Sequence, residues 1–259
     1  MTRPFALPQF PSVDLANSEF ARRVALAAQP EPEPAARPKV GRVFNELQWL
    51  LEPARRPFRT YDIAPAKRPQ IVLIFPGFAT RPKKLRHFSR LLETAGHKTK
   101  RWGLGFNWGA DESALDKLED RLGAIRERYD SNVVLLGWSL GGLYARELAK
   151  RQPDCVDKVI TMGTPFSGSP RSNNAWRIYQ AIAGYSVDEP PLEIDRRQKP
   201  PVETVAMWSP RDGVIAPRSA AGEPGERDRA IALRCTHMGF TYSPESVQAL
   251  LAELDRHPR

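Results

Sequence analysis

The segment 137–142, Gly-Trp-Ser-Leu-Gly-Gly, constrains this chain more than any other part of it. It follows the apolar run 133–136 and precedes a stretch of helical character at 143–150. This pattern predicts a buried strand that ends on a tight turn at Ser139, from which a helix begins. A side chain at either glycine two residues away from Ser139 would crowd that turn, so the glycines have a steric purpose. The helix would direct its N-terminal N–H groups toward negative charge that forms beside the serine.

Strand and helix patterns alternate from about residue 57 onward. Strands are expected at 58–63, 71–75, 97–102, 133–136, 156–162, 202–208 and 230–235. Helices are expected at 85–95, 114–129, 140–150 and 244–254. Strands separated by helices of this length predict an α/β fold, with a mostly parallel central sheet and helices on both of its faces. In such sheets, ligands bind at the carboxyl ends of the strands.

The first 56 residues are expected to form a proline-rich extension with short helices, ahead of an α/β domain at 57–259. Four prolines between residues 30 and 38 predict a stiff, extended linker. Short helices are expected at 14–28 and 40–51. The second has apolar residues at helical spacing, and we expect that face to pack on the domain. A helix that associates weakly with a membrane surface, or that binds a partner, is the alternative.

Residues 165–201 interrupt the alternation between two strands. A helix is expected at 174–183, and two Pro-Pro pairs bound the charged loop that follows it. An insertion at this point would lie over the carboxyl edge of the sheet. It is a candidate cap, although an ordinary crossover helix with a long loop fits the pattern equally well.

Charge, apolar content and cysteine content limit which partners and which cellular compartment are expected. The net charge is +9, but the basic clusters at 81–86 and 196–199 contain no interleaved aromatic residues, so nucleic acid is not expected as a partner. No apolar run is long enough to span a membrane, and the first residues do not resemble a secretory signal. Cys155 and Cys235 are expected at opposite edges of the sheet as free thiols, which agrees with a cytoplasmic location.

A nucleophilic serine needs a base within hydrogen-bond reach and an acid that orients the base. The chain has four histidines, and His237 follows the last predicted strand, at the sheet edge where Ser139 should project. Asp212 follows the preceding strand at the same edge, whereas Asp188 and Asp195 lie in the candidate cap. The chain order Ser139, Asp212, His237 therefore predicts a catalytic triad.

The oxyanion of a tetrahedral intermediate needs two N–H donors. The first expected donor is the N–H of Leu140, which directly follows the nucleophile. The second is the N–H of Phe78, because Pro76-Gly77 lets the backbone of that loop approach the substrate. No metal or cofactor is expected.

These motifs resemble the α/β-hydrolase superfamily in its lipase and esterase branch, over roughly residues 58–255. The resemblance rests on the serine turn and on Pro-Gly-Phe at 76–78, Met-Gly-Thr-Pro at 162–165, Arg-Asp-Gly-Val at 211–214 and Thr-His-Met-Gly at 236–239. Proline stands at position 76, where many members have histidine. The loop at 102–107 also resembles one found in bacterial relatives. The resemblance implies a bacterial serine hydrolase with the α/β-hydrolase fold and a small helical cap.

The expected activity is hydrolysis of carboxylic esters with apolar groups. Residues expected to line the substrate pocket are Trp138, Phe166, Trp176, Tyr179 and Met238. An acyltransferase or a thioesterase would use the same three catalytic residues. A non-catalytic binding protein is the third alternative, but such proteins usually lack one of the three.

Overall fold

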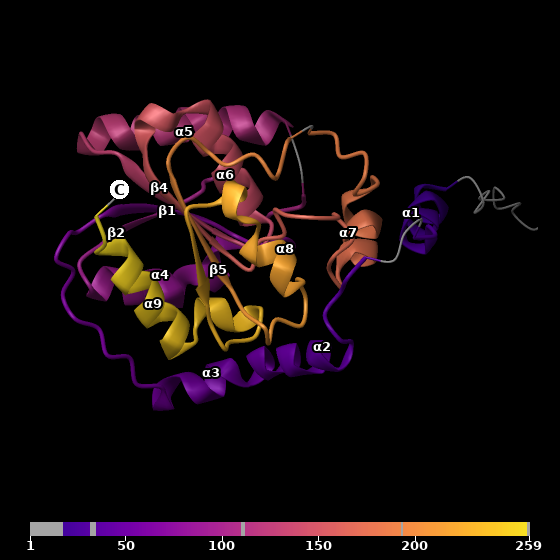
Figure 1. Cartoon of the computed structure of the whole chain (residues 1–259), viewed down its shortest axis with the longest axis horizontal. Coiled ribbons are helices and arrows are strands. Elements are labelled where there is room, and N and C mark those ends of the chain that lie inside the picture. The colour runs from indigo at the N-terminus through magenta and orange to yellow at the C-terminus, as the bar shows by residue number, and fades with distance from the viewer. Residues whose placement is uncertain (1–17, 32–34, 110–111, 193, 258–259) are drawn as a thin grey trace, which may run out of the picture.

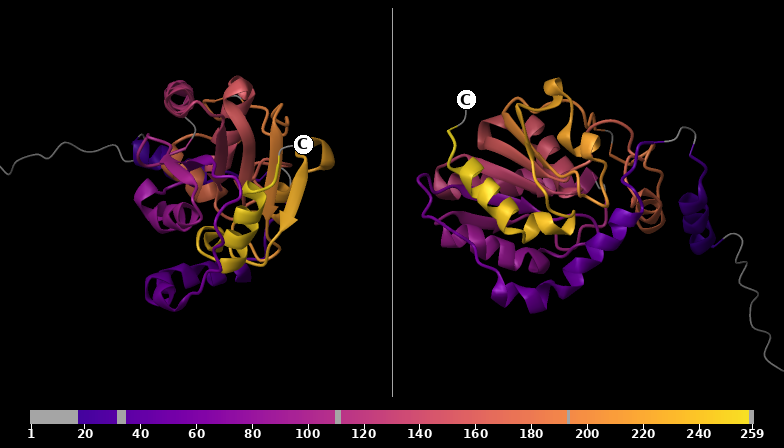
Figure 2. Two further views of the ribbon diagram at one scale, coloured as in Figure 1. Left: turned by 90° about the vertical axis from the view of Figure 1, so that its left-hand side faces the viewer. Right: turned by 60° about the horizontal axis from the view of Figure 1, so that its bottom comes forward.

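The computed structural model describes residues 18–31, 35–109, 112–192 and 194–257. The centre of this part of the chain is a six-stranded, fully parallel sheet in the order β2-β1-β3-β4-β5-β6 (Figures 1 and 2). The strands are β1 (Ile71–Phe75), β2 (Lys98–Arg101), β3 (Val133–Trp138), β4 (Val156–Met162), β5 (Glu203–Trp208) and β6 (Arg229–Ala232). Strand β2 is added on one side of β1, whereas β3 and the strands after it are added on the other side, so the order of strands reverses between β1 and β3. Ligands of such folds bind at the carboxyl ends of the two strands beside such a reversal.

Helices cover both faces of the sheet. Helices α4 (Arg86–Thr94) and α9 (Pro244–Leu254) lie on one face, and α5 (Glu112–Tyr129) and α6 (Gly141–Arg151) lie on the other (Figure 1). Alternate residues of β1 enter the two cores, since Val72 packs with α4 and α9 whereas Leu73 packs with α5 and α6. Burial on both faces explains why the central strands are continuous apolar runs. The predicted fold class is therefore confirmed.

Shorter elements connect and flank this layer structure. The remaining α-helices are α1 (Glu19–Ala28), α2 (Gly41–Glu46), α3 (Glu52–Arg55), α7 (Trp176–Ala183) and α8 (Pro217–Ala221). Short 3₁₀ segments span Leu47–Leu51, Arg56–Phe58, Pro82–Leu85, Pro153–Cys155, Pro224–Glu226 and Met238–Thr241. Among the residues that the structure describes, no helix is long and apolar enough to cross a membrane. Both cysteines are free thiols.

The prediction of a strand at 58–63 is wrong. Phe58 ends a 3₁₀ segment and is 87% exposed, and no strand forms over the residues that follow it. Pro57 and Pro65, which lack an N–H, bound this stretch. Instead it runs along the domain, where the Tyr61 hydroxyl donates to the Tyr242 carbonyl at 2.7 Å. Strand β6 also ends earlier than predicted, at Ala232.

In the described part of the N-terminal extension, α1 lies against α7, and Glu46 of α2 contacts the loops that follow β5 and β6 at the carboxyl edge of the sheet. Helix α1 packs on α7, and the Arg177 guanidinium donates to the carbonyls of Ala27 and Gln29 at 2.7 and 2.8 Å. A helix was expected at 14–28; α1 begins at Glu19, and residues 14–17 lie outside the described residues.

The second helix of the extension is present, but the prediction that its apolar face packs on the domain is wrong. Phe44 and Leu47 are 69% and 54% exposed. The side chains that face the domain are instead the carboxylates of Glu46 and Glu52, which are 6% and 4% exposed. Both find hydrogen-bond donors there, which balances the cost of removing a charged group from water.

Candidate active site

Ser139 lies at the carboxyl end of β3 in a left-handed backbone conformation, with φ +54°. A non-glycine residue rarely adopts this conformation, and strain of this kind is typical of a nucleophile at a strand-to-helix turn. A Cβ at Gly137 would lie 2.3 Å from the Gly142 Cα, and one at Gly141 would lie 2.4 Å from the Phe75 carbonyl oxygen. Larger residues are therefore excluded on both sides of Ser139, as the sequence predicted.

His237 and Asp212 form a buried pair at the same edge of the sheet. His237 Nδ1 lies 2.8 Å from Asp212 Oδ2, and the two side chains are 4% and 1% exposed. The other carboxylate oxygen, Asp212 Oδ1, accepts the N–H groups of Val214 and Ile215, each at 2.8 Å. These two bonds hold the carboxylate in place, so that Oδ2 faces the imidazole.

Trp138 joins the serine turn to the histidine loop. Its indole Nε1 donates to the His237 carbonyl at 3.1 Å, and its ring centroid lies 5.7 Å from the imidazole centroid. A Cβ at Gly77, at the end of β1, would lie 3.1 Å from both Ser139 Cβ and the Trp138 ring. The serine turn, the histidine loop and the loop after β1 therefore meet at one place, beside the reversal of strand order.

The charges around His237 favour the protonated form of its imidazole. Burial opposes protonation of His237, but the charge and hydrogen bond of Asp212, together with the charge of Glu46, outweigh it. The pKa of His237 is therefore raised above its ordinary value of 6.5. A base with a raised pKa accepts a proton from a serine hydroxyl more readily.

The loop after β1 is held by Asn107, which is fully buried. Asn107 Nδ2 donates to the Pro76 carbonyl at 2.7 Å, and the Asn107 carbonyl accepts the Ala79 N–H at 2.8 Å. The loop at 102–107, singled out in the sequence by resemblance alone, thus positions the backbone on both sides of Phe78. Within the described part of the chain, the N–H groups of Phe78 and Leu140 form no hydrogen bond to a backbone carbonyl.

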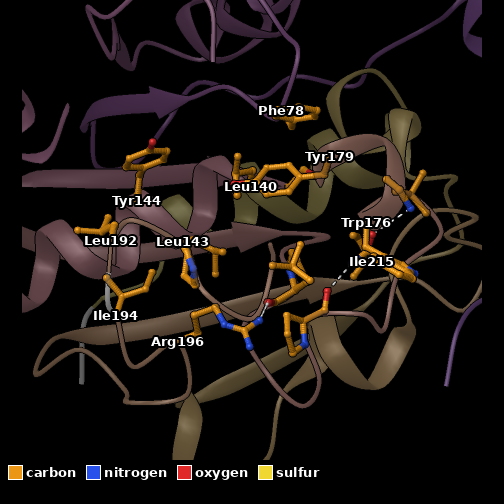
Figure 3. Close-up of a pocket in the computed structure, with 18 of the residues that line it drawn as sticks. Phe78, Leu140, Leu143, Tyr144, Trp176, Tyr179, Leu192, Ile194, Arg196 and Ile215 are labelled. Atoms are coloured by element: carbon orange, nitrogen blue, oxygen red, sulfur yellow. Dashed lines mark hydrogen bonds between the residues drawn. The ribbon is translucent and has the colours of Figure 1, made fainter. Parts of the chain in front are cut away.

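A mostly apolar cavity of about 140 Å³ opens beside Ser139 (Figure 3). Twelve of its twenty lining residues come from the candidate cap at 165–201. Trp176 and Tyr179 of α7 are among them, as are Phe78 and Leu140 from the sheet edge. The rings of Phe78 and Tyr179 are in contact, with centroids 4.7 Å apart. Helix α7 therefore packs directly on the loop that carries Phe78.

Three residues expected in the pocket lie elsewhere. Trp138 supports the histidine loop, as described above. Phe166 is fully buried beneath the Arg146 guanidinium, which lies 4.2 Å from its ring centroid. Met238 is half-buried and packs against the core between the sheet and α9. Sequence position placed all three near the serine, but the direction of each side chain depends on tertiary packing.

Glu46 of the N-terminal extension is a site residue that the sequence did not indicate. Its Oε1 accepts the N–H groups of Gly213 and His237 at 2.9 and 2.8 Å, and its Oε2 accepts the Met238 N–H at 2.9 Å. One buried carboxylate thereby ties the aspartate loop to the histidine loop. The only signal in the sequence is an acidic residue on the polar side of a short helix, which is too common to identify such a role.

Replacing Glu46 by glutamine is expected to lower kcat by roughly 10- to 100-fold, because the amide NH₂ cannot accept the third N–H and the histidine loop loses its position. Loss of the negative charge should also lower the pKa of His237 and move the acidic limb of the kcat/KM profile to lower pH. Steady-state kinetics as a function of pH would measure both effects.

Glu52→Gln is the matched control, since Glu52 is another buried carboxylate of the same extension but pairs with Arg59. It should lower the melting temperature without moving the pH profile. Equal pH profiles for Glu46→Gln and the wild type would show that Glu46 has only a structural role.

No protein-family model matches the chain. Two curated relatives are pimeloyl-(acyl-carrier protein) methyl ester esterases. The protein from Nitrosospira multiformis is 32% identical over 99 residues, which are 38% of this chain and 36% of that protein. The one from Vibrio cholerae is 33% identical over 75 residues, or 28% of each chain. The match thus spans about a third of the length of these relatives.

Solved structures cover more of the chain at lower identity. The monoacylglycerol lipase of Paleococcus ferrophilus superposes with a TM-score of 0.51 at 16% identity, over 74% of this chain and 96% of that one. Lipase B of Aspergillus fumigatus superposes with a TM-score of 0.54 at 16% identity, over 77% of this chain and 55% of that one. An extracellular α/β-hydrolase from a Paenibacillus species superposes with a TM-score of 0.50 at 12% identity, over 72% of this chain and 99% of that one. These likenesses show a shared fold.

Proposed function

Because this chain has the fold of the α/β-hydrolase superfamily, we propose that it hydrolyses carboxylic esters through an acyl-enzyme on Ser139. His237 is the general base and Asp212 orients it. The observation that carries the proposal is the buried 2.8 Å contact between His237 Nδ1 and Asp212 Oδ2, at the sheet edge where Ser139 occupies a strained turn. The names of the curated relatives agree with this chemistry.

The reaction proceeds in two halves. Ser139 Oγ attacks the ester carbonyl carbon while His237 Nε2 takes the hydroxyl proton. The tetrahedral intermediate collapses, and His237 returns the proton to the departing alcohol. In the second half, His237 takes a proton from water as the water oxygen attacks the acyl carbon. The second tetrahedral intermediate collapses when His237 gives that proton to Ser139 Oγ, which breaks the bond to the acyl group and releases the carboxylic acid. Asp212 holds the imidazole with Nδ1 protonated, and it stabilises the positive charge that appears twice in the cycle.

The N–H groups of Leu140 and Phe78 are the proposed oxyanion donors. Leu140 is the N-cap residue of α6, whose positive dipole end adds to the attraction. The contact of Asn107 with the Pro76 carbonyl keeps the Phe78 peptide in place, so the donor is oriented before the charge develops.

The substrate class follows from the cavity wall. Leucine, isoleucine, valine and aromatic side chains from α6 and the cap surround the space beside Ser139. Such a surface favours an apolar acyl or alcohol group, and Glu147 and Arg196 are the two charged side chains among its lining residues. We therefore propose that the substrates are small esters with apolar substituents.

A p-nitrophenyl ester series of increasing acyl chain length tests this proposal. The wild type should hydrolyse at least one member, and kcat/KM should pass through a maximum as the acyl chain fills the cavity. Substituting Tyr179→Ala removes one wall and should move that maximum to a longer chain. Failure of the wild type to hydrolyse any ester would refute the proposed activity.

The pH dependence of hydrolysis provides a separate prediction. Only neutral His237 can accept the Ser139 proton, so kcat/KM should rise with pH through the pKa of the free enzyme. Because Asp212 and Glu46 raise that pKa, the midpoint of the rise should lie above pH 6.5. A midpoint below 6.5 would contradict this account of the base.

A further inference from the structure

The segment 40–58, which contains α2 and α3, is amphipathic in the reverse of the usual sense. Surface helices ordinarily bury their apolar stripe and expose their charges. Here the carboxylates of Glu46 and Glu52 are buried. The large apolar side chains are exposed, from 37% to 87%, and they are Val40, Val43, Phe44, Leu47, Leu50, Leu51 and Phe58.

These exposed side chains lie on one side of the segment. Val40, Phe44, Leu47 and Leu51 follow one another at intervals of three and four residues, which places them in a row. The segment forms the outer rim of the molecule, below α9 and α4, and its outward side faces away from the sheet (Figures 1 and 2). Apolar patches of this kind on a soluble fold mark sites of interaction.

The polar border of this patch is positively charged. Residues 39–59 contain five basic residues and two acidic ones, and both acidic residues are the buried glutamates. Arg42 and Arg55 line a polar cavity beside the segment, together with Arg211 and Arg234 of the neighbouring loops and with Arg59, which pairs with Glu52. The exposed charges along segment 40–58 are thus all positive.

We propose that segment 40–58 docks on the surface of a membrane that contains anionic lipid. The apolar row enters the boundary between headgroups and acyl chains, and the arginines meet the lipid phosphates. An apolar row whose neighbouring exposed charges are all positive complements a surface that is apolar inside and anionic at its headgroups. Nucleic acid would not use the apolar row. The docking does not depend on the proposed ester hydrolysis.

Vesicle co-sedimentation of the full chain tests this proposal. The protein should bind vesicles of phosphatidylcholine with phosphatidylglycerol at least about tenfold more tightly than vesicles of phosphatidylcholine alone. The double substitution Phe44→Gln with Leu47→Gln should weaken binding to the anionic vesicles by more than about tenfold. The double substitution Arg55→Glu with Arg56→Glu should abolish the preference for anionic vesicles.

Two controls separate docking from other effects. Phe20→Gln removes a side chain that is 73% exposed on α1, outside the segment, and should bind vesicles as the wild type does. Ser139→Ala should also bind normally, so a failure of catalysis and a failure of docking can be told apart. Circular dichroism would verify that each variant is folded.

The proposal would be overturned if the wild type did not bind anionic vesicles, or if the Phe44/Leu47 variant bound them as tightly as the wild type. It would also be overturned if Phe20→Gln weakened binding as much as the Phe44/Leu47 variant does. A concentration-dependent dimer that the Phe44/Leu47 variant abolishes, without vesicle binding, would assign the face to a second copy of the chain instead.

Discussion

Replacing Ser139 by alanine is expected to lower kcat for p-nitrophenyl ester hydrolysis by roughly 10⁶-fold. The substitution removes the atom that would form the acyl-enzyme, and no other group in the site can take its place. The remaining rate would come from direct attack of water on the ester, which the oxyanion donors and the cavity would still assist. The left-handed turn is strained for alanine as it is for serine, so stability should change little.

Labelling with a fluorophosphonate probe tests the same residue without a substrate. The wild type should be labelled, and Ser139→Ala should not be. Ser131→Ala is the matched control, because Ser131 is exposed just before β3 and should leave labelling intact. Equal hydrolysis or equal labelling by the wild type and Ser139→Ala would exclude Ser139 as the nucleophile.

Replacing Asp212 by asparagine is expected to lower kcat by about 10⁴-fold while the fold is kept. The amide oxygen can retain the two bonds to Val214 and Ile215, so the amide NH₂ must face His237. An NH₂ group there requires Nδ1 to accept a hydrogen bond, which moves the imidazole proton to Nε2. The base then cannot take the proton of Ser139.

Asp195→Asn is the matched control, since Asp195 is an exposed carboxylate of the candidate cap with no contact to His237. Its activity should stay within about twofold of the wild type. The pH profile gives a second measurement, because loss of the Asp212 charge should lower the pKa of His237. A small effect of Asp212→Asn on kcat, with an unchanged pH profile, would remove Asp212 from the proposed triad.

Much of the fold could be predicted because its determinants are local. The strand at 156–162 and the helix at 244–254 have the bounds that their apolar periodicity predicted. The exception at 58–63 has a local apolar and aromatic pattern but no neighbouring strand to pair with. Pairing depends on where the rest of the sheet lies, and periodicity carries no information on that.

The N-terminal extension shows more clearly which features the local sequence predicts and which depend on the rest of the structure. Apolar spacing at 40–51 predicted a helix, and a helix and 3₁₀ segment are present. The choice of which face packs on the domain was decided by hydrogen-bond donors at the far end of the chain. Three N–H groups, from Gly213, His237 and Met238, converge where they can receive Glu46. That carboxylate is buried, and the leucines face outward.

By itself, the sequence determined the α/β alternation, the glycines around Ser139 and the chain order of serine, aspartate and histidine. Each of these depends on neighbours a few residues away or on the rule that parallel strands end at one edge. Only the tertiary structure decided that Asp212 and His237 are in contact, that Asn107 holds the Phe78 loop, and which residues line the cavity. Those features depend on the directions of side chains from elements far apart in the chain, and packing alone determines them.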